Sequence, residues 1–517
     1  MGDIYSASTG TLPSIPTDLS IPQFFLDHQL DPTRPQRHGI PCLIDDGSGR
    51  QISHGELQER TFGLANALES LYFIVLLFSR NHVDYPVVIW AVHRLGGIIS
   101  PANPDFSHYE LEFQLRATRT TLLIAHPDVL DTSLSAAQAV GLPNERILVL
   151  NGPNVLSMES LPFTEHRMRP GDGKTKIAFL SFSSANTLQL AAHSRTGRYR
   201  PGDIAIGDIY GLVVNMTLVV VSKFNFERML KSIVRHRISH LVIVPPQAVL
   251  LCKHPAVKSY DLSGIRYIMI GAAPLSDEVN EMLFRLFPDA HIGQGYGMTE
   301  TCTVTSIWPI ERKRGISGSA GQLVPGVVAR VVKTDGTLGR YNEVGELVVK
   351  SPSNALGYHN NQQATKETFV DGWVRTGDEV KISPDGELWI IDRIKEIMKV
   401  RGFQVAPAEL EGTLLDHRDI SDACVVGVPD DFSGEVPLAF VVLSVDAAGR
   451  VERNPDCLQE IKVSILKHVA DHKVGYKHLA GGVEFVESIP KTPSGKLLRR
   501  VLRERAKELK KAAKAKL

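Results

Sequence analysis

Short apolar runs recur along the first 300 residues of the chain, between stretches with the three- and four-residue spacing of amphipathic helices. Clear runs occur at residues 74–78, 122–125, 241–244 and 267–270. Apolar runs of this length, bounded by polar and turn residues, are typical of strands buried on both faces. The alternation of such strands with helices predicts an α/β fold.

The pattern changes near residue 327, where short alternating runs replace the helical spacing as far as residue 388. Asp-Gly pairs at 335–336, 371–372 and 385–386 punctuate this region, and such pairs favour tight turns between antiparallel strands. The region therefore predicts a mainly β subdomain.

A charged stretch at residues 392–396 follows, and the chain beyond it has helix and strand patterns of its own. Strands are predicted at 423–428 and 438–443, and helices at 407–415 and 457–469. We therefore predict a large N-terminal domain at residues 1–393, made of α/β subdomains plus the β subdomain. A small, mobile α+β domain is predicted at residues 394–517.

The composition is that of a folded protein and excludes several function classes. The 517 residues are 43% apolar and 22% charged, which rules out a disordered or fibrous chain. Lys and Arg total 57, as do Asp and Glu, so no net field attracts nucleic acid or an anionic membrane. The five cysteines are scattered and odd in number, which favours a reducing compartment over a disulfide framework.

The two ends of the chain suggest where the protein works. We expect it to be neither exported nor integral to a membrane, because no apolar run reaches about 18 residues and the N-terminus lacks a signal layout. Ala515-Lys516-Leu517 is similar to the Ser-Lys-Leu tail that the peroxisomal import receptor recognises. Peroxisomal localisation is expected, with a solvated basic helix in a cytoplasmic protein as the alternative.

A lysine loop near the C-terminus is the sharpest chemical motif. Residues 490–496 read Pro-Lys-Thr-Pro-Ser-Gly-Lys, and two prolines with a glycine exclude helix and central strand. Lys496 would then be a mobile positive charge able to reach an anion. Taken alone, the segment also fits an ordinary solvated basic loop.

A second motif, at residues 294–300, reads Gln-Gly-Tyr-Gly-Met-Thr-Glu. Gly295 and Gly297 allow a flat or phosphorylated ligand close to the backbone, and Tyr296 between them could stack on a base. Thr299 and Glu300 offer a hydroxyl and a carboxylate, oxygen ligands of the kind Mg²⁺ accepts beside nucleotide phosphates. A glycine-rich turn is the alternative.

Two further motifs lie between these. Residues 371–378 end in Asp378, a carboxylate able to accept two hydrogen bonds from neighbouring ribose hydroxyls. Residues 392–405 run from the charged stretch into a strand and are followed by Pro407 and Glu409. Each of these segments alone would fit a hairpin or a helix start.

In this order, the four segments closely resemble the adenylate-forming superfamily of acyl-CoA and aryl-CoA ligases, beetle luciferases and peptide-synthetase adenylation domains. The resemblance runs from about residue 21 to residue 500. Residues 271–275, Gly-Ala-Ala-Pro-Leu, are similar to the adenine-side turn of the family, which includes Ala273 and Pro274. Residues 402–411 look most like the 4-coumarate:CoA ligase subgroup.

The resemblance implies a reaction in two halves. A carboxylate attacks the α-phosphate of Mg-ATP to give an acyl-adenylate, and the thiol of coenzyme A then displaces AMP. Lys496 would bridge the carboxylate and the α-phosphate as charge builds up. Glu300 would hold Mg²⁺ with Thr299 at the phosphates, and the expected cofactors are ATP, Mg²⁺ and coenzyme A.

The resemblance also assigns the nucleotide and hinge positions. Tyr296 would stack on adenine, while Asp378 and Arg393 would bind the ribose. Lys395 occupies the hinge position about which the small domain rotates between the half-reactions. Lys399, with Gly402, would belong to the face presented during thioester formation.

The chain departs from the family pattern where a Ser/Thr/Gly-rich loop ending in a lysine normally wraps the β- and γ-phosphates. Here Ser183-Ser184 is followed directly by residues 185–189, Ala-Asn-Thr-Leu-Gln. Similar short losses are expected near residues 72–73, 207–208 and 216–217. Losing one preorganised donor typically costs about 10² to 10³ in rate, so poor turnover is expected.

Three functions follow from these features. The first is an ATP-dependent acid:CoA ligase acting on an aromatic or fatty carboxylic acid, and it accounts for the nucleotide motifs and the tail. The second is a catalytically impaired member without the phosphate loop. The third is a luciferase-like or carrier-protein-serving adenylating enzyme. The expected partners are a small carboxylic acid, coenzyme A and the import receptor, and not nucleic acid.

Overall fold

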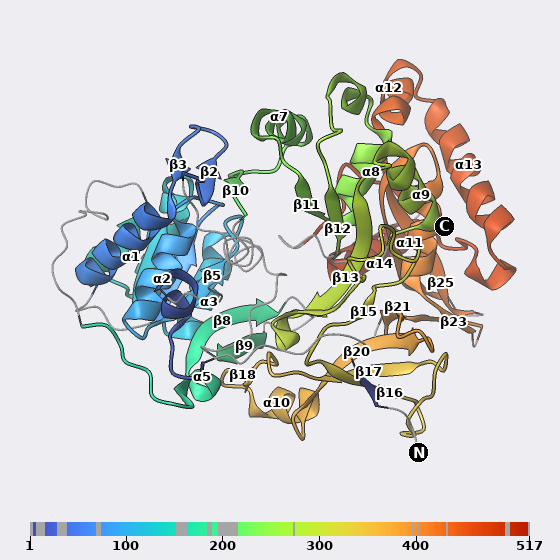
Figure 1. Ribbon diagram of the computed structural model, residues 1–517. Helices are drawn as coiled ribbons and strands as arrows, with labels where there is room; N and C mark the ends of the chain where they lie inside the picture. Colours follow the sequence, from blue (N-terminus) through green and yellow to red (C-terminus); the bar gives the residue numbers. More distant parts are fainter. Residues whose placement is uncertain are drawn as a thin grey trace.

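The computed structural model describes residues 4–6, 16–27, 39–68, 74–150, 164–183, 189–194, 216–271, 275–394, 396–401, 403–430, 433–491 and 497–514. Figure 1 shows the N-terminal helices and sheet in blue and teal on one side of the molecule. The green and yellow elements and the orange-to-red C-terminal elements form the other side. Helices pack against sheets throughout, as the alternating pattern predicts.

The first sheet has the order β18-β9-β8-β5-β4-β6-β7. Its strands are β4 (Ile74–Phe78), β5 (Ile98–Ala102), β6 (Leu122–Ala125), β7 (Ile147–Val149), β8 (Ile177–Ser183), β9 (Gln189–Ser194) and β18 (Gly357–Tyr358). The strands from β4 to β8 are parallel, whereas β9 runs antiparallel to β8 and β18 antiparallel to β9. The predicted strands at 74–78 and 122–125 are confirmed.

Helices cover both faces of this sheet (Figure 1). They are α1 (His54–Leu68), α2 (Tyr85–Arg94), α3 (His108–Thr118), α4 (Leu130–Val140) and the short α5 (Asp172–Thr175). Val75 and Leu77 pack with α1 and α2, whereas Leu76 and Phe78 pack with α3 and α4. Both sets of strand side chains are buried, which explains the continuous apolar run.

The second sheet has the order β11-β12-β13-β14-β15, in which β11, β12 and β13 are parallel. Its elements are β11 (His240–Ile243), β12 (Tyr267–Ile270), β13 (His291–Met298), β14 (Thr303–Ile307), β15 (Gln322–Leu323), α7 (Phe226–His236), α8 (Pro245–Lys253) and α9 (Asp277–Leu286). The strand expected at 241–244 begins and ends one residue earlier, because Pro245 starts α8 and Val244 becomes its N-cap. The strand at 267–270 is confirmed.

A small sheet, in the order β10-β2-β3, joins these two halves, since β10 follows the first sheet in the chain and pairs with the early strand β2. Its strands are β2 (Leu43–Asp45), β3 (Gln51–Ile52) and β10 (Leu218–Val220).

The β subdomain forms a third large sheet, with the order β1-β16-β17-β20-β19 and β21 paired with β20. Its elements are β1 (Tyr5–Ser6), β16 (Val328–Val332), β17 (Gly345–Lys350), α10 (Gln362–Thr368), β19 (Phe369–Val370), β20 (Trp373–Ile382) and β21 (Leu388–Arg393). The three Asp-Gly turns have positive φ angles at Gly336, Gly372 and Gly386. The expected mainly β region is therefore present.

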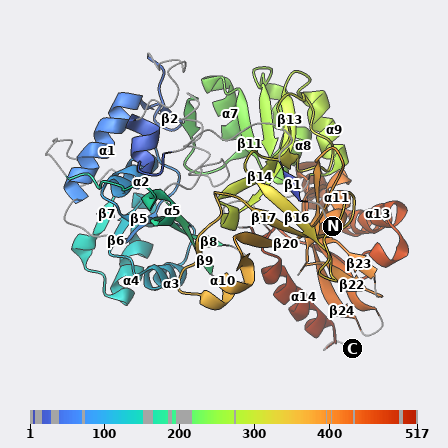
Figure 2. The ribbon, with the colours of Figure 1, turned by 60° about the horizontal axis from the view of Figure 1, so that its bottom comes forward.

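The last sheet has the order β23-β22-β25-β24, with β26 beside β25. Its elements are β22 (Met398–Val400), β23 (Phe403–Val405), β24 (Ile420–Asp430), β25 (Gly434–Leu443), β26 (Gly482–Phe485), α11 (Pro407–Asp416), α12 (Val445–Arg453), α13 (Cys457–His472) and α14 (Arg499–Lys514). Figure 2 shows α14 along the edge of this part of the molecule. The two strands and two helices expected here are present, each longer than expected.

The C-terminal elements pack against the second half of the large domain. One continuous apolar cluster includes Leu251 of α8 and Val279 of α9 together with Leu410 and Leu414 of α11. The Lys253 ammonium at the end of α8 donates to the carbonyls of Leu415 (2.6 Å) and His417 (3.1 Å) at the end of α11. Lys253 therefore caps a helix of the other domain. The exact boundary at residue 393 stays a prediction.

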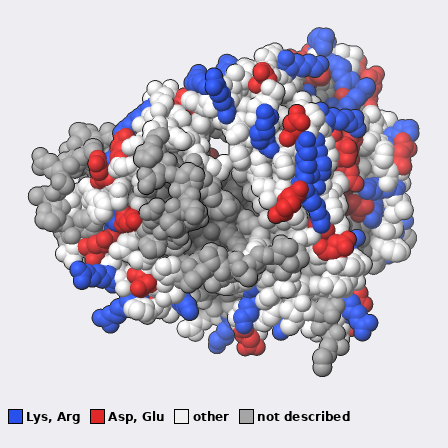
Figure 3. Space-filling view, in the orientation of Figure 1, with Lys and Arg blue, Asp and Glu red and all other residues white. Residues whose placement is uncertain are grey.

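No helix in the described ranges combines the length and apolar character of a membrane-spanning segment. Figure 3 shows acidic and basic side chains intermingled on the described surface in this view.

Candidate active site

The second motif lies on the long strand β13, which continues past its parallel neighbours and then pairs antiparallel with β14. Gly295 lies close to its neighbouring strand, because a Cβ there would be 3.2 Å from the Ser306 carbonyl oxygen, a tighter contact than most side chains make. The register shifts between Tyr296 and Gly297, so a β-bulge redirects the strand at these residues. Open α/β sheets commonly bind ligands at this carboxyl end.

Tyr296 and Asp378 are in direct contact. The Tyr296 hydroxyl donates a 2.5 Å hydrogen bond to Asp378 Oδ2, and Asp378 on β20 is only 4% exposed. The Asp378 amide in turn donates to Thr376 Oγ1 at 3.1 Å. Burial, followed by the nearby negative charge of Asp378, raises the pKa of Tyr296 well above its usual range. The phenol therefore remains a hydrogen-bond donor at neutral pH.

Arg393 completes this cluster from the neighbouring strand. Asp378 and Arg393 are paired residues in β20 and β21, and Arg393 Nε lies 3.3 Å from Asp378 Oδ1. Burial acts to lower the pKa of Arg393, but the carboxylates of Asp378 and Glu396 outweigh it and raise that pKa. The structure thus brings together three of the expected nucleotide-site residues from separate motifs.

Glu300 lies immediately after β13, in the 3₁₀ turn of Thr299–Thr301. Its side chain is 3% exposed, and Oε1 accepts a 2.8 Å hydrogen bond from the Tyr358 hydroxyl. Among the residues that the structure describes, no cation lies within 4 Å of its carboxylate. The guanidinium of Arg393 acts on this carboxylate electrostatically without forming an ion pair with it. Because a buried carboxylate whose hydrogen-bond donor is neutral favours a cation beside it, Glu300 fits the expected Mg²⁺ ligand. Thr299, which is expected to supply a hydroxyl to the same site, is half-buried next to it.

A buried ion cluster connects this site to the small domain. Arg499, at the start of α14, donates to Glu396 and Glu411, each at 2.5 Å. Asp392 accepts from the Ala408 amide at 2.9 Å, and burial raises the pKa of Asp392. The segment after Arg393 is therefore tied to the first helix of the small domain.

The ends of the lysine loop are paired with each other. Lys491 and Leu497 form an antiparallel bridge, and the Leu498 amide donates to the Pro490 carbonyl at 2.9 Å. The Lys491 ammonium lies 2.5 Å from Asp422 Oδ2 on β24. Lys496 itself lies outside the described residues, as do Lys395, Gly402, Ala273 and Pro274.

Lys399 lies in a different sheet from the Tyr296 cluster. It is the middle residue of β22, and its amide donates to Glu435 Oε2 at 2.9 Å. Among the described residues, no hydrogen bond or ion pair joins Lys399 to Tyr296, Asp378 or Glu300. Tyr358 is the residue that sequence reasoning missed, since a Gly-Tyr pair in a β region carries no chemical signal of its own.

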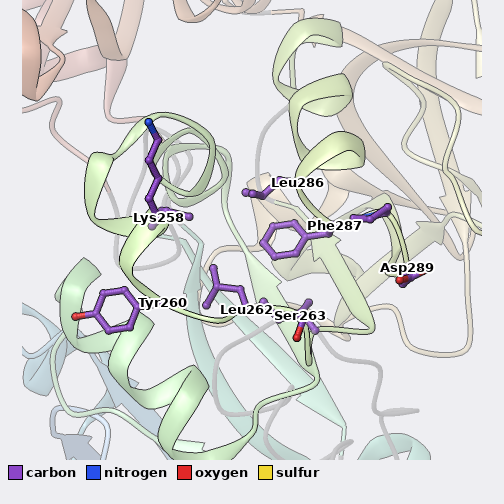
Figure 4. Close-up of a pocket in the computed structure, with 10 residues that line it drawn as sticks. Lys258, Tyr260, Leu262, Ser263, Leu286, Phe287 and Asp289 are labelled. Carbon is purple, nitrogen blue, oxygen red and sulfur yellow. The ribbon is translucent and has the colours of Figure 1, made fainter.

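A cavity of about 330 Å³ lies away from these residues. Figure 4 shows Leu262 and Phe287 in its lining, from the segments that precede β12 and β13. It therefore opens at the amino ends of the strands, opposite the edge that carries Glu300. The cavity is not part of the candidate active site.

Comparison with known proteins decides the family. The AMP-binding enzyme family matches residues 31–187 and 205–359, and its C-terminal domain matches residues 409–496. The chain belongs to the AMP-binding enzyme family. The adenylate-forming assignment is therefore confirmed, and the family match is interrupted at residues 188–204, beside the segment where a shortened loop is expected.

Curated relatives of this AMP-binding enzyme are CoA ligases. 4-coumarate--CoA ligase 3 of Arabidopsis thaliana is 32% identical in an alignment 511 residues long, which covers 90% of this chain and 88% of the relative. Acyl-CoA ligase AFT1-1 of Alternaria alternata is 32% identical in an alignment 567 positions long, gaps included, which covers 95% of this chain and 96% of the relative. The expected enzyme class, an acid–thiol ligase, is the class of these relatives.

Solved structures confirm the fold of this AMP-binding enzyme, with its large N-terminal and small C-terminal domain. The anthranilate CoA ligase AuaEII in complex with anthranoyl-AMP has a TM-score of 0.82 and 22% identity, over 95% of this chain and 98% of that one. The amide bond synthetase McbA of Marinactinospora thermotolerans has a TM-score of 0.74 and 26% identity, over 89% and 96%.

Proposed function

We propose that this AMP-binding enzyme is an ATP-dependent acid:CoA ligase that activates an aromatic or fatty carboxylic acid as an acyl-adenylate and transfers it to coenzyme A. The observation that carries the proposal is the contact of Tyr296, Asp378 and Arg393 beside the buried carboxylate of Glu300. Relatives named as 4-coumarate and acyl-CoA ligases, aligned over most of the chain, support this reaction class.

In this proposal the Tyr296 cluster binds the nucleoside. Asp378 accepts hydrogen bonds from the two ribose hydroxyls, and Arg393 places a positive charge beside its carboxylate. The Tyr296 hydroxyl holds the carboxylate in place while its ring offers a face to adenine.

Glu300 and Thr299 would hold Mg²⁺, which when bound would offset the negative charge of the phosphates. Lys496 stabilises the charge that develops between the acid and the α-phosphate. In the second half-reaction, movement about Lys395 brings the Lys399 face toward the adenylate, where the thiol of coenzyme A displaces AMP.

A second candidate is a catalytically impaired family member, and one observation favours it. Strands β8 and β9 pair as far as Ser183 and Gln189, so only residues 184–188 connect them. Five residues offer fewer amides to the β- and γ-phosphates than a longer glycine-rich loop does. A luciferase-like or carrier-protein-serving enzyme would share the first half-reaction and differ in the acceptor.

The deciding experiment measures pyrophosphate release with Mg-ATP and a panel of aromatic and fatty acids, followed by thioester formation with coenzyme A. The same assays are run on a protein with a family-type loop inserted between Ser184 and Ala185. Thioester formed by the unaltered protein supports the ligase. Activity in the restored protein alone supports the impaired member. Adenylate without thioester in both points to another acceptor.

Peroxisomal localisation is part of the same proposal. It rests on Ala515-Lys516-Leu517, which lie outside the described residues. A fluorescent fusion with these residues at its C-terminus should enter peroxisomes, and removing the three residues should leave it in the cytoplasm.

A further inference from the structure

The segment 351–358 holds Glu300 at several points. The Ala355 amide donates to the Glu300 carbonyl at 2.8 Å, and the Tyr358 hydroxyl donates to the Glu300 carboxylate at 2.8 Å. The Ser353 hydroxyl donates to the Thr301 carbonyl at 3.0 Å. We call this segment the Glu300 clamp. Both the backbone and the carboxylate of Glu300 are therefore fixed by a stretch of chain more than 50 residues away.

Tyr358 is itself rigidly placed. Its amide donates to Thr365 Oγ1 at 2.9 Å, and its ring lies edge-on to Phe369 at 5.4 Å between centroids. Gly357 before it has a φ of +143°, and a Cβ there would lie 2.8 Å from Thr365 Cγ2, so only glycine fits. These contacts fix the ring of Tyr358, and its hydroxyl also has a side-chain hydrogen bond with Thr368 in α10.

The clamp also reaches the shortened loop. Gly357 and Tyr358 form β18, which pairs with Ala192 and Ala191 of β9, the strand that follows residues 184–188. Figure 1 shows β18 beside β9 at the edge of the first sheet. A single ladder thus connects the strand after the phosphate-loop position to the tyrosine that contacts Glu300.

The Tyr358 hydroxyl is suited to orienting a metal-binding carboxylate. The hydroxyl donates to Oε1 at 2.8 Å, and both side chains are buried. A neutral donor on Oε1 fixes the plane of the carboxylate without supplying a charge that competes with a cation. Such outer partners typically change metal affinity by about 10- to 100-fold when removed.

We propose that Tyr358 is a positioning residue that orients the Glu300 carboxylate toward the divalent cation of the nucleotide. The inference rests on the proposed function, because it assigns the cation to Glu300. If Tyr358 only stabilised the fold, removing its hydroxyl would lower stability but would leave the affinity for the cation unchanged.

The test measures Mn²⁺ binding to the full-length protein with the non-hydrolysable analogue α,β-methylene-ATP, by the spin-resonance signal of free Mn²⁺. The variants are Tyr358→Phe, Glu300→Gln and the double variant. Phenylalanine keeps the ring against Phe369 and removes only the hydroxyl. Tyr5→Phe is the matched control, since the buried Tyr5 hydroxyl donates at 3.0 Å to the Gly339 carbonyl in the β subdomain.

We expect Tyr358→Phe to weaken Mn²⁺ binding about 10- to 100-fold, with Tyr5→Phe unchanged. In the Glu300→Gln background the same substitution should have almost no further effect, because Tyr358 acts through that carboxylate. Equal effects in both backgrounds, or a Tyr358→Phe affinity within twofold of the unaltered protein, would overturn the inference. Melting temperatures show whether each variant folds, and if Tyr358→Phe does not, Tyr358→Met removes the same hydroxyl and provides the comparison.

The unaltered protein separates this inference from the proposed function. If it binds no Mn²⁺ with the analogue, the cation assignment to Glu300 fails and the role of Tyr358 fails with it. If it binds Mn²⁺ and Tyr358→Phe binds equally well, only the role of Tyr358 fails.

Discussion

The Asp378 carboxylate and the Arg393 guanidinium are directly opposite each other in adjacent strands, with 3.3 Å between Oδ1 and Nε. Because Asp378 is also the acceptor of the Tyr296 hydroxyl, removing its charge should affect both partners. We expect Asp378→Asn to lower the free energy of unfolding by about 1–3 kcal/mol. It should also raise the KM for ATP roughly tenfold, which corresponds to about 1.4 kcal/mol.

Urea unfolding and initial rates of pyrophosphate release at varied ATP check this prediction. Asp385→Asn is the control, since Asp385 is an exposed turn residue of the same β subdomain. An unchanged KM for ATP in Asp378→Asn would contradict a ribose-binding role.

Lys496 is expected to act in adenylate formation alone. An ammonium that stabilises developing charge at the α-phosphate contributes typically about 10² to 10³ in rate. Lys496→Ala should therefore lose that factor in pyrophosphate release, while thioester formation from supplied acyl-adenylate stays within a few-fold. Both half-reactions are measured on the same preparation, with the exposed Lys507→Ala as the control. Equal loss in the two half-reactions would refute the assignment.

The buried strands were the most predictable part of the fold. β4, β6 and β12 were placed without error because their side chains pack on both faces, which leaves an unbroken apolar run in the sequence. β11 was displaced by one residue, since Val244 is apolar like a strand residue but precedes the Pro245 that starts a helix.

The sequence could predict residues of the candidate site only where they belong to motifs whose residue types bind ligands or take part in catalysis. Tyr296, Asp378 and Arg393 belong to recognisable motifs, and the structure joins them. Tyr358 and Lys253 could not be found, because their roles depend on contacts with Glu300, 58 residues away, and with Leu415, 162 residues away. No local pattern records such pairings.

Arg499 should be among the most sensitive positions for stability. It is the cation shared by the buried carboxylates of Glu396 and Glu411. Removing one partner of a buried ion cluster typically costs about 3–5 kcal/mol, because the remaining charges stay buried without compensation. We expect Arg499→Met to lower the free energy of unfolding by about that amount. The exposed Arg505→Met on the same helix is the control, and a loss below about 1 kcal/mol would contradict the cluster's importance.

Lys253 should fix the docking of the small domain on α8. Its ammonium satisfies two carbonyls at the end of α11, and hydrogen bonds to charged groups contribute about 1.5–3 kcal/mol. Lys253→Met should therefore increase hydrogen exchange in residues 407–417 more than in the core strands β4 and β6. Lys258→Met, at an exposed position nearby in the chain, should not. Unchanged exchange at α11 in Lys253→Met would show that apolar packing alone holds this contact.

His417 should make this same contact sensitive to acid. Burial, above all, lowers the pKa of His417 below its ordinary value of 6.5, and His468, Lys253 and Arg418 act in the same direction against Asp419. His417 Nδ1 accepts the Asp419 amide at 3.2 Å, and Nε2 lies 3.0 Å from Ser464 Oγ. Protonation would place a hydrogen on Nδ1 and break the first of these bonds.

A histidine whose pKa is lower in the folded than in the unfolded state stabilises the fold fully at pH values above its ordinary pKa. This stability is lost as the pH falls through the folded-state pKa. The urea concentration at the unfolding midpoint should therefore decrease as the pH is lowered from 7 to 5. In His417→Asn this decrease should be smaller, because Asn Oδ1 can accept the Asp419 amide without titrating. His82, His126, His240 and His359 also have lowered pKa values, so the variant should keep part of the pH dependence. An identical fall in both proteins would place the acid sensitivity at groups other than His417.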